Sequence, residues 1–182
     1  AKLTGGENTG DDVTGGYILQ QNYWDASNSF ESNYSPIDHP GFDVHFVHEY
    51  PEPDTINVAQ RIYIAAYVDS LETALYSADF VDPVIGYRRY LDVPSFIDYF
   101  LVNEVARSND GFKKSVFFHK DKNSNGGKLK AGPVWDFDWA WKDIDICNIY
   151  HGYSGAGWAH KNNDCFTDNY STGWAVRLLQ DS

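Results

Sequence analysis

Apolar residues between positions 55 and 79 recur at steps of three and four, the spacing of one face of an amphipathic helix. The members of that face are Ile64, Val68, Leu71, Leu75 and Ala78. Asp54 suits the position before the helix, because its carboxylate can accept hydrogen bonds from the first free backbone amides. Pro83 lies beyond the last apolar position and ends the pattern. The sequence therefore predicts a long core helix over residues 55–79.

A second helix is predicted to begin near Pro94, since proline is favoured in the first helical turn. Its apolar stripe consists of Ile97, Leu101 and Val105, with Phe96 and Phe100 beside it. We expect both helices to pack in the core.

Shorter apolar runs predict strands. Residues 17–19 and 42–48 suit buried or half-buried strands. Residues 115–120 and 128–134 flank the turn-forming stretch 121–127 and so predict a β-hairpin. Two core helices, a β-hairpin and a loop-rich C-terminal part together indicate an α+β fold in a single domain. The glycine-rich residues 1–15 predict a flexible N-terminal segment.

The composition narrows the class of protein without identifying it. Hydrophobic residues make up 42% of the 182 residues, so we expect a folded domain rather than a disordered chain. No stretch reaches the roughly 18 consecutive apolar residues of a membrane-spanning helix. The net charge of −12 disfavours nucleic acids and anionic membranes as partners. There is no Met, so Ala1 is not an initiator and we expect a processed product or a piece of a longer protein.

One basic segment interrupts this acidic chain. Seven of the fourteen Lys and Arg residues lie between Arg107 and Lys130, where Asp110 and Asp121 are the only acids. Such a segment suits either an anionic ligand or a solvated face of the hairpin.

The predicted hairpin brings acidic loops together. If Lys120 pairs with Lys128, the numbers of antiparallel partners sum to about 248. Asp138 then falls opposite Asp110, with Asp136 beside this pair. Three close carboxylates ionise together only beside a cation, and hard oxygen ligands suit Mg²⁺ or Ca²⁺. The alternative is that these acids cap turns.

Protein kinases have the same order of loop, hairpin and Asp-Phe-x. In that template the loop Asp accepts the proton of the substrate hydroxyl, and the Asp after the hairpin holds Mg²⁺ on the phosphates. An Asn five residues after the loop Asp takes the second metal ion. This chain has Ser115, a poorer ligand, at that position.

Further motifs surround these parts of the sequence. They are Gly16-Tyr17-Ile18-Leu19, Tyr50-Pro51-Glu52-Pro53, Asn103-Glu104, Asn109-Asp110, Leu129-Lys130-Ala131-Gly132-Pro133-Val134-Trp135-Asp136-Phe137-Asp138 and Trp174-x-x-Arg177-Leu178-Leu179. Together they resemble the CotH family, the spore-coat protein H-like kinases of the secretory pathway, which also occur in surface proteins of bacteria that make no spores. The resemblance runs from about residue 15 to the last residue.

The resemblance implies an atypical protein-kinase-like large lobe that uses ATP and Mg²⁺ (or Ca²⁺ or Mn²⁺) to phosphorylate Ser residues of secreted, surface or spore-coat proteins. It therefore implies a bacterial protein that is secreted or displayed at the cell surface. By position, Asp110 would be the catalytic base, Asp136 a metal ligand and Asp138 a second candidate ligand. The supporting residues would be Asn109, Lys113, Lys114 and Ser115, with Glu104 either a buried acid that orients the loop or an exposed one at the helix end.

One departure limits what the resemblance implies. The chain contains no Gly-rich phosphate loop followed by a strand Lys, which the small lobe of a kinase would supply. We therefore expect residues 1–182 to be a large-lobe portion, with the small lobe and the extreme C-terminus outside it, and to be inactive alone.

Two other functions fit the same residues. A non-catalytic extracellular module would bind glycans or proteins through its 13 Tyr and 6 Trp side chains and would hold structural Ca²⁺. The paired carboxylates also suit glycoside hydrolysis.

Three weaker signals have plainer explanations. Residues 121–126 begin like an EF-hand loop, but Gly132 stands where that loop requires Glu, so a hairpin turn explains them better. His45 and His48 lie three apart on a strand and so face opposite sides, which disfavours a shared zinc ion. Cys147 and Cys165 suit either a disulfide in an exported protein or two free thiols.

Overall fold

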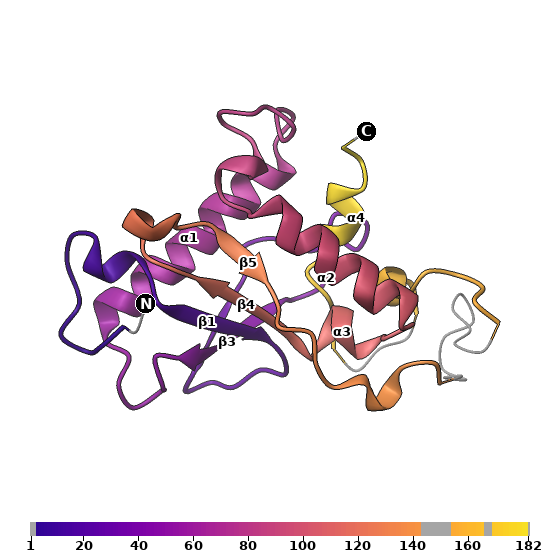
Figure 1. The fold of residues 1–182 in the computed structure, drawn as a ribbon, viewed down its shortest axis with the longest axis horizontal. Coiled ribbons are helices and arrows are strands. Elements are labelled where there is room, and N and C mark those ends of the chain that lie inside the picture. The colour runs from indigo at the N-terminus through magenta and orange to yellow at the C-terminus, as the bar shows by residue number, and fades with distance from the viewer. Residues whose placement is uncertain (1–2, 143–153, 166–168, 182) are drawn as a thin grey trace.

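The computed structural model describes residues 3–142, 154–165 and 169–181 of the chain. At its centre is one five-stranded sheet with the order β2-β3-β1-β4-β5 (Figure 1). Every pair of neighbouring strands is antiparallel. The strands are β1 (Tyr17–Gln21), β2 (Ser29–Glu31), β3 (His45–Tyr50), β4 (Val116–Lys120) and β5 (Leu129–Ala131). Strands were therefore correctly predicted near residues 17–19, 42–48 and at the hairpin.

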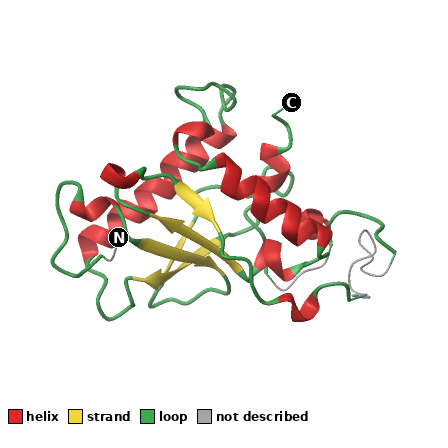
Figure 2. Ribbon diagram, in the orientation of Figure 1, coloured by secondary structure: helices red, strands yellow, loops and turns green. Residues whose placement is uncertain are grey.

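Helices lie beside this sheet, as Figure 2 shows. The α-helices are α1 (Val58–Tyr76), α2 (Val93–Val105), α3 (Asp110–Lys113) and α4 (Trp174–Leu178). Short 3₁₀ helices are η1 (Asp12–Thr14), η2 (Tyr87–Arg89), η3 (Asn123–Asn125), η4 (Phe137–Trp139) and η5 (Ala159–Asp164). The mixed helix-and-strand architecture is the one that the sequence predicts. Among the described residues, no helix is both long and apolar enough to cross a membrane.

The helix α1 is the predicted long helix, and it is three residues shorter at each end. Asn57 caps it in place of Asp54. The Asn57 side chain accepts a hydrogen bond from the Gln60 amide (3.0 Å), and the Gln60 side chain accepts one from the Asn57 amide (3.0 Å). Four members of its predicted apolar face, Ile64, Val68, Leu71 and Leu75, are buried in the same core as the sheet residues. Full burial of each such side chain contributes about 1.5–3 kcal/mol. The fifth, Ala78, lies beyond the end of the helix and is exposed, so its inclusion in the face was wrong.

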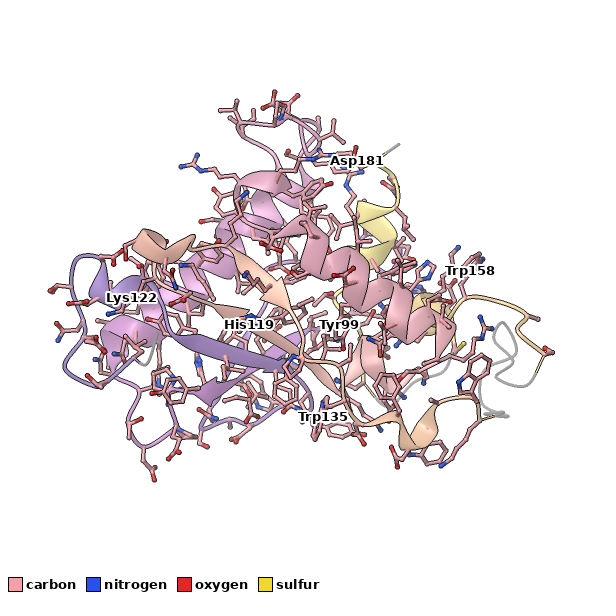
Figure 3. All side chains as sticks on the ribbon, in the orientation of Figure 1. Tyr99, His119, Lys122, Trp135, Trp158 and Asp181 are labelled. Carbon is pink, nitrogen blue, oxygen red and sulfur yellow. The ribbon has the colours of Figure 1, made fainter. Side chains whose placement is uncertain are left out.

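The helix α2 begins where the sequence predicts, but its predicted core stripe is wrong. Ile97, Leu101 and Val105 are 52%, 52% and 67% exposed. The buried residues of α2 are Tyr99 (labelled in Figure 3), Asn103 and Glu104. The spacing of apolar residues defines a face but does not say which face the rest of the chain covers. Here the covered face is the one whose polar groups hold the loop that follows the helix.

The hairpin of β4 and β5 forms with a register one residue away from the predicted one. Phe118 pairs with Ala131, and Lys120 pairs with Leu129 instead of Lys128. On β4, Val116, Phe118 and Lys120 point into the core, whereas Phe117 and His119 lie half-buried on the other face. Because β5 ends at Ala131, the strand pairing stops well before the acidic residues that follow it.

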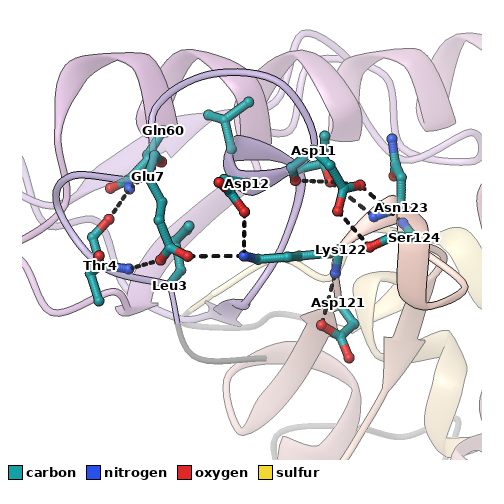
Figure 4. Close-up of polar contacts among 12 residues, drawn as sticks. Leu3, Thr4, Glu7, Asp11, Asp12, Gln60, Asp121, Lys122, Asn123 and Ser124 are labelled. Carbon is teal, nitrogen blue, oxygen red and sulfur yellow. Dashed lines mark hydrogen bonds and ion pairs between the residues drawn. The ribbon is translucent and has the colours of Figure 1, made fainter.

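The N-terminal segment, predicted as flexible over residues 1–15, packs against the domain from residue 3 onwards (Figure 4). Leu3 is only 2% exposed and belongs to the core. The Gln60 side chain donates to the backbone carbonyls of Thr4 (2.7 Å) and Glu7 (2.9 Å). Lys122, at the hairpin turn, bonds to the carboxylates of Glu7 (2.9 Å) and Asp12 (2.8 Å). Polar contacts to α1 and to the hairpin thus fix a segment that has little apolar patterning.

Candidate active site

The loop between α2 and β4 is held from inside by the last turns of α2. The Tyr99 hydroxyl donates to the Gly111 carbonyl (2.8 Å), and the Ser108 amide donates to the Asn103 carbonyl (2.9 Å). A Cβ atom on Gly111 would lie 2.0 Å from Asn103 Oδ1, so the close approach of the loop to α2 requires glycine there. This packing fixes the position of Asp110, the residue before Gly111.

Asp110, the predicted catalytic base, is buried at the start of α3. Its Oδ1 lies 3.8 Å from Lys113 Nζ and 3.9 Å from Lys114 Nζ. Lys113 is itself buried, and its backbone carbonyl accepts hydrogen bonds from Gln21 (3.1 Å) and Asn169 (2.7 Å). The two ammonium groups offset the cost of burying the carboxylate. The structure therefore brings three predicted site residues together.

Ser115 joins the two predicted acidic positions. Its hydroxyl donates to Asp136 Oδ2 (2.9 Å), and its amide donates to the Asp110 carbonyl (2.9 Å). Asp136 is exposed and adopts a left-handed backbone conformation with φ of 60°, which turns the chain away from the hairpin. Ser115 thus orients Asp136, a role that differs from the metal-binding position to which the kinase template assigned it.

Asp138 lies in η4 and is exposed. The antiparallel projection placed it opposite Asp110, but strand pairing ends at Ala131 and the turn at Asp136 breaks the projection. Among the described residues, Asp38, His39 and Asp164 form the one group of three potential metal ligands whose atoms lie within 4.8 Å of one another. Asp110, Asp136 and Asp138 do not form a group of that spacing, and a site shared through one hydrated cation stays a prediction.

A looser arrangement still suits Mg²⁺. This ion usually keeps several waters and takes one or two carboxylates together with substrate phosphates, so it needs no cage of three acids. Asp136 offers an exposed carboxylate that Ser115 holds by one oxygen. Asp138 is a second exposed carboxylate two residues away. Both are the hard oxygen donors that Mg²⁺ prefers.

Glu104 is a buried acid, the first of its two predicted alternatives. It accepts hydrogen bonds from the Ala159 amide (2.7 Å), the His160 amide (3.1 Å) and His160 Nδ1 (3.2 Å). Burial alone would raise the pKa of Glu104, but these hydrogen bonds outweigh it and hold the pKa below its usual value. Glu104 thus fastens η5 to the end of α2. Asn109 is also buried, and its carbonyl accepts a hydrogen bond from the Phe112 amide (3.1 Å).

The basic segment is used mostly inside the protein. Its members Arg107, Lys113 and Lys120 are buried. Arg107 donates to the carbonyls of Ala156 and Gly157, and Lys128 donates to the carbonyl of Arg88 (2.7 Å). Lys122 is paired with acids of the N-terminal segment, as described above. Burial and internal pairing of these side chains argue against a fully solvated face, and an anionic ligand of this segment stays a prediction.

The weaker sequence signals resolve into structural roles. Asn123 Oδ1 accepts a hydrogen bond from Lys120 Nζ (3.1 Å). The Asp121 carboxylate accepts hydrogen bonds from the Lys122 amide (2.8 Å) and from the Asn125 side chain. The oxygens that resemble those of an EF-hand loop therefore bond within the hairpin turn. Burial lowers the pKa of Lys120 to about 8, against the charges of Asp11 and Asp121. Cys165 is disulfide-bonded, and Cys147 lies outside the described residues.

Sequence reasoning missed two aromatic residues at this site. The Tyr23 hydroxyl accepts a hydrogen bond from Lys114 Nζ (3.2 Å), and the Trp135 indole donates to the Ser115 carbonyl (3.1 Å). Trp135 stood within the family motif, beside Asp136, and could have been singled out there. Tyr23 follows β1 and carries no sequence signal that links it to Lys114.

One known protein family matches this chain over nearly its whole length. The family model described as CotH kinase protein matches residues 7–182, so the chain belongs to the CotH kinase family. The match contains every predicted site residue. No curated protein and no solved structure matched the chain.

Proposed function

We propose that this domain takes part in phosphoryl transfer from ATP to Ser hydroxyls of secreted or surface proteins, with the large-lobe architecture of an atypical protein kinase. The observation that carries the proposal is the link through Ser115 between Asp110, which is flanked by two lysines, and Asp136, which is exposed. Membership of the CotH kinase family supports the same reaction. A bacterial secreted or cell-surface location is part of this proposal.

Each residue has one task in the proposed reaction. Asp110 takes the proton of the acceptor hydroxyl as that oxygen bonds to the γ-phosphorus and the bond to the ADP oxygen breaks. Lys113 and Lys114 stabilise negative charge on the transferred group. Asp136, with Asp138 as the second candidate ligand, would hold Mg²⁺, which when bound neutralises charge on the phosphates. Ser115 keeps the Asp136 carboxylate pointed at that position.

Phosphoryl transfer by residues 1–182 alone is expected to be slow. They contain no Gly-rich phosphate loop followed by a strand Lys. Phosphoryl transfer depends almost entirely on positioning and charge stabilisation, so a site without those groups transfers slowly.

The test is ATP binding to residues 1–182, measured by calorimetry with and without Mg²⁺. Binding that requires Mg²⁺ and weakens at least 10-fold in Asp136→Asn is expected, since the primary carboxylate ligand is lost. Asp98→Asn, an exposed acid on α2, is the matched control and should bind as the wild type does. Binding that ignores both Mg²⁺ and the Asp136 change would contradict the proposal.

One observation favours a second function, a non-catalytic binding module. Five of the six Trp side chains are at least 46% exposed, and only Trp174 is buried. Exposed indoles are typical of surfaces that bind proteins or glycans. Glycan-array binding by a chain that does not bind MgATP would support this function over phosphoryl transfer.

A further inference from the structure

Two carboxylates and an imidazole converge where the loop between β2 and β3 meets the end of η5. His39 Nε2 lies 2.6 Å from Asp164 Oδ1 and 3.9 Å from Asp38 Oδ2. One potential ligand atom from each residue lies within 4.8 Å of the other two. Asp38 and His39 stand in a turn of the loop, whereas Asp164 is the last residue of η5. The group therefore joins two segments that are 125 residues apart in the sequence.

The two carboxylates lack the partners that other acids of this chain have. Asp82, for example, accepts hydrogen bonds from the amides of Val84 (2.7 Å) and Ile85 (3.0 Å). Among the described residues, the carboxylates of Asp38 and Asp164 accept no hydrogen bond from a backbone amide and have no Lys or Arg side chain at ion-pair distance. Capping of a turn therefore does not explain these two acids.

One imidazole nitrogen cannot satisfy both carboxylates by hydrogen bonding. Nε2 of His39 carries at most one hydrogen, and the 2.6 Å contact with Asp164 uses it. Asp38 is then a second negative charge beside the same nitrogen, and two like charges at one position are costly unless a cation lies between them. A metal ion bound to Nε2 and to one oxygen of each acid would satisfy all three groups.

The imidazole is held in place before any ion binds. The His39 ring stacks on Phe42 with centroids 5.0 Å apart, and Phe42 stacks on Tyr170 at 3.8 Å. The His39 side chain is only 19% exposed. Two atoms bound to one tetrahedral zinc ion lie about 3.4 Å apart, because each bond is about 2.1 Å long. The distances of 2.6 Å and 3.9 Å lie on either side of that value, so small side-chain shifts complete the geometry.

We propose that Asp38, His39 and Asp164 bind one Zn²⁺ ion, with water as the fourth ligand, and that this ion fastens the loop before β3 to the end of η5. The imidazole nitrogen decides the choice of metal, because it suits zinc, whereas Mg²⁺ and Ca²⁺ take oxygen ligands. This inference goes beyond the proposed function and involves no nucleotide.

The ion acts on a part of the chain that supports the candidate active site. In the segment after η5, the Asn169 side chain donates to the Lys113 carbonyl (2.7 Å), and the Tyr170 carbonyl accepts from the Gln21 side chain (2.8 Å). An ion that holds Asp164 to the loop therefore also stabilises the packing behind Lys113.

The experiment is calorimetric titration of chelator-treated residues 1–182 with ZnCl₂, MgCl₂ and CaCl₂, without reductant so that the disulfide stays intact. We expect Zn²⁺ to bind at least 10-fold more tightly than Mg²⁺ or Ca²⁺. Each of Asp38→Asn, His39→Asn and Asp164→Asn should weaken zinc binding at least 10-fold, because each removes one of three protein ligands. Zinc at 100 times its Kd should raise the unfolding midpoint of the wild type by about 5–10 °C and should shift these variants less.

Two matched controls should bind zinc as the wild type does. Asp43→Asn removes an exposed acid of the same loop, and His119→Asn removes a half-buried histidine of β4. Thermal melts without zinc establish that each variant is folded.

Three results would overturn the inference. They are the absence of saturable zinc binding, binding of Mg²⁺ or Ca²⁺ as tight as that of zinc, and zinc affinity that is unchanged by any one of the three ligand substitutions. Loss of ATP binding would contradict the proposed function alone, because none of these zinc measurements uses a nucleotide.

Discussion

The Ser115 hydroxyl donates a hydrogen bond of 2.9 Å to the Asp136 carboxylate, although the whole β4–β5 hairpin lies between these residues in the sequence. This bond holds the segment that follows β5 against the residue that precedes β4. It also leaves one carboxylate oxygen of Asp136 turned away from Ser115. The hairpin therefore places the exposed carboxylate of Asp136 next to Ser115, at the end of the loop that contains Asp110.

Replacing Ser115 by Ala tests this relationship. We expect Mg²⁺-dependent ATP binding to weaken about threefold to 10-fold, because Asp136 loses the group that orients it. Stability should fall by only about 1 kcal/mol, the usual net contribution of one hydrogen bond. Calorimetry and urea unfolding measure the two effects. Ser154→Ala, which removes an exposed hydroxyl, should change neither quantity, and unaltered binding in Ser115→Ala would show that Asp136 needs no orienting partner.

Asp136 and Asp138 are expected to differ in importance. Asp136→Asn should reduce Mg²⁺-dependent ATP affinity at least 10-fold, whereas Asp138→Asn should reduce it less than threefold. The reason is that Ser115 holds the Asp136 carboxylate in place by a hydrogen bond. The Asp138 carboxylate, in η4, accepts no hydrogen bond within the part of the chain that the structure describes. Affinities at saturating Mg²⁺ decide between them. Equal losses would indicate a site with two ligands of similar weight.

Gly111 is expected to be essential for the stability of the site. Gly111→Ala places a methyl group 2.0 Å from Asn103 Oδ1, so buried groups must move, at a cost of about 1–3 kcal/mol. Urea unfolding measures the loss. Gly6→Ala is the control, since a Cβ atom there meets nothing within 4 Å, and its stability should stay within about 0.5 kcal/mol of the wild type. Similar values for both variants would argue against the tight packing of the loop on α2.

Two buried residues should give opposing pH dependences of stability. Glu72 of α1 bonds to Ser32 (2.6 Å) and Trp174 (3.0 Å), and burial raises its pKa to about 7. Its folded-state pKa exceeds the unfolded value, so the folded state keeps the proton longer and stability falls as pH rises from about 4.5 to 7. Burial, with the charge of Arg61, lowers the pKa of His48 to about 4, so stability falls as pH drops from about 6.5 to 4.

Single variants should reveal each titration, because the two nearly cancel in the wild type. The double variant His48→Gln/Glu72→Gln lacks both titrating groups and serves as the reference. In His48→Gln only Glu72 still titrates, so the free energy of unfolding should fall by up to about 3 kcal/mol between pH 4.5 and 7 relative to this reference. In Glu72→Gln only His48 still titrates, so the free energy of unfolding should fall by up to about 3 kcal/mol between pH 6.5 and 4 relative to the same double variant. Urea midpoints across this pH range provide the measurement. Parallel curves for all variants would mean that neither group titrates as its burial indicates.

The sequence predicted the elements better than their orientation. The face of α1 could be predicted because the same apolar spacing repeats from Ile64 to Leu75. The face of α2 could not, because polar groups hold it in place: the Tyr99 hydroxyl bonds to the following loop, and the Glu104 carboxylate bonds to η5, which is distant in the sequence. Such bonds leave no periodic signal.

The candidate site shows the same limit. Asp110, its lysines and Asp136 follow from the order of loop, hairpin and motif. The role of Ser115 and the contact of Tyr23 with Lys114 depend on how β1 and the turn at Asp136 pack, which spacing along the chain does not encode. The projection of Asp138 onto Asp110 is not supported by strand pairing, because a projected register holds only as far as the strands pair and β5 ends at Ala131.

The strand order of the sheet has a consequence for synthesis of the chain. β1 lies between β3 and β4, and its partner β4 is almost one hundred residues away from it in sequence. While the ribosome is still adding α1 and α2, β1 can pair with β3 but has one side without a partner. An unpaired strand edge is a template for association with other chains. Nascent chains that pause before Lys120 should therefore need chaperones more than those that have passed it.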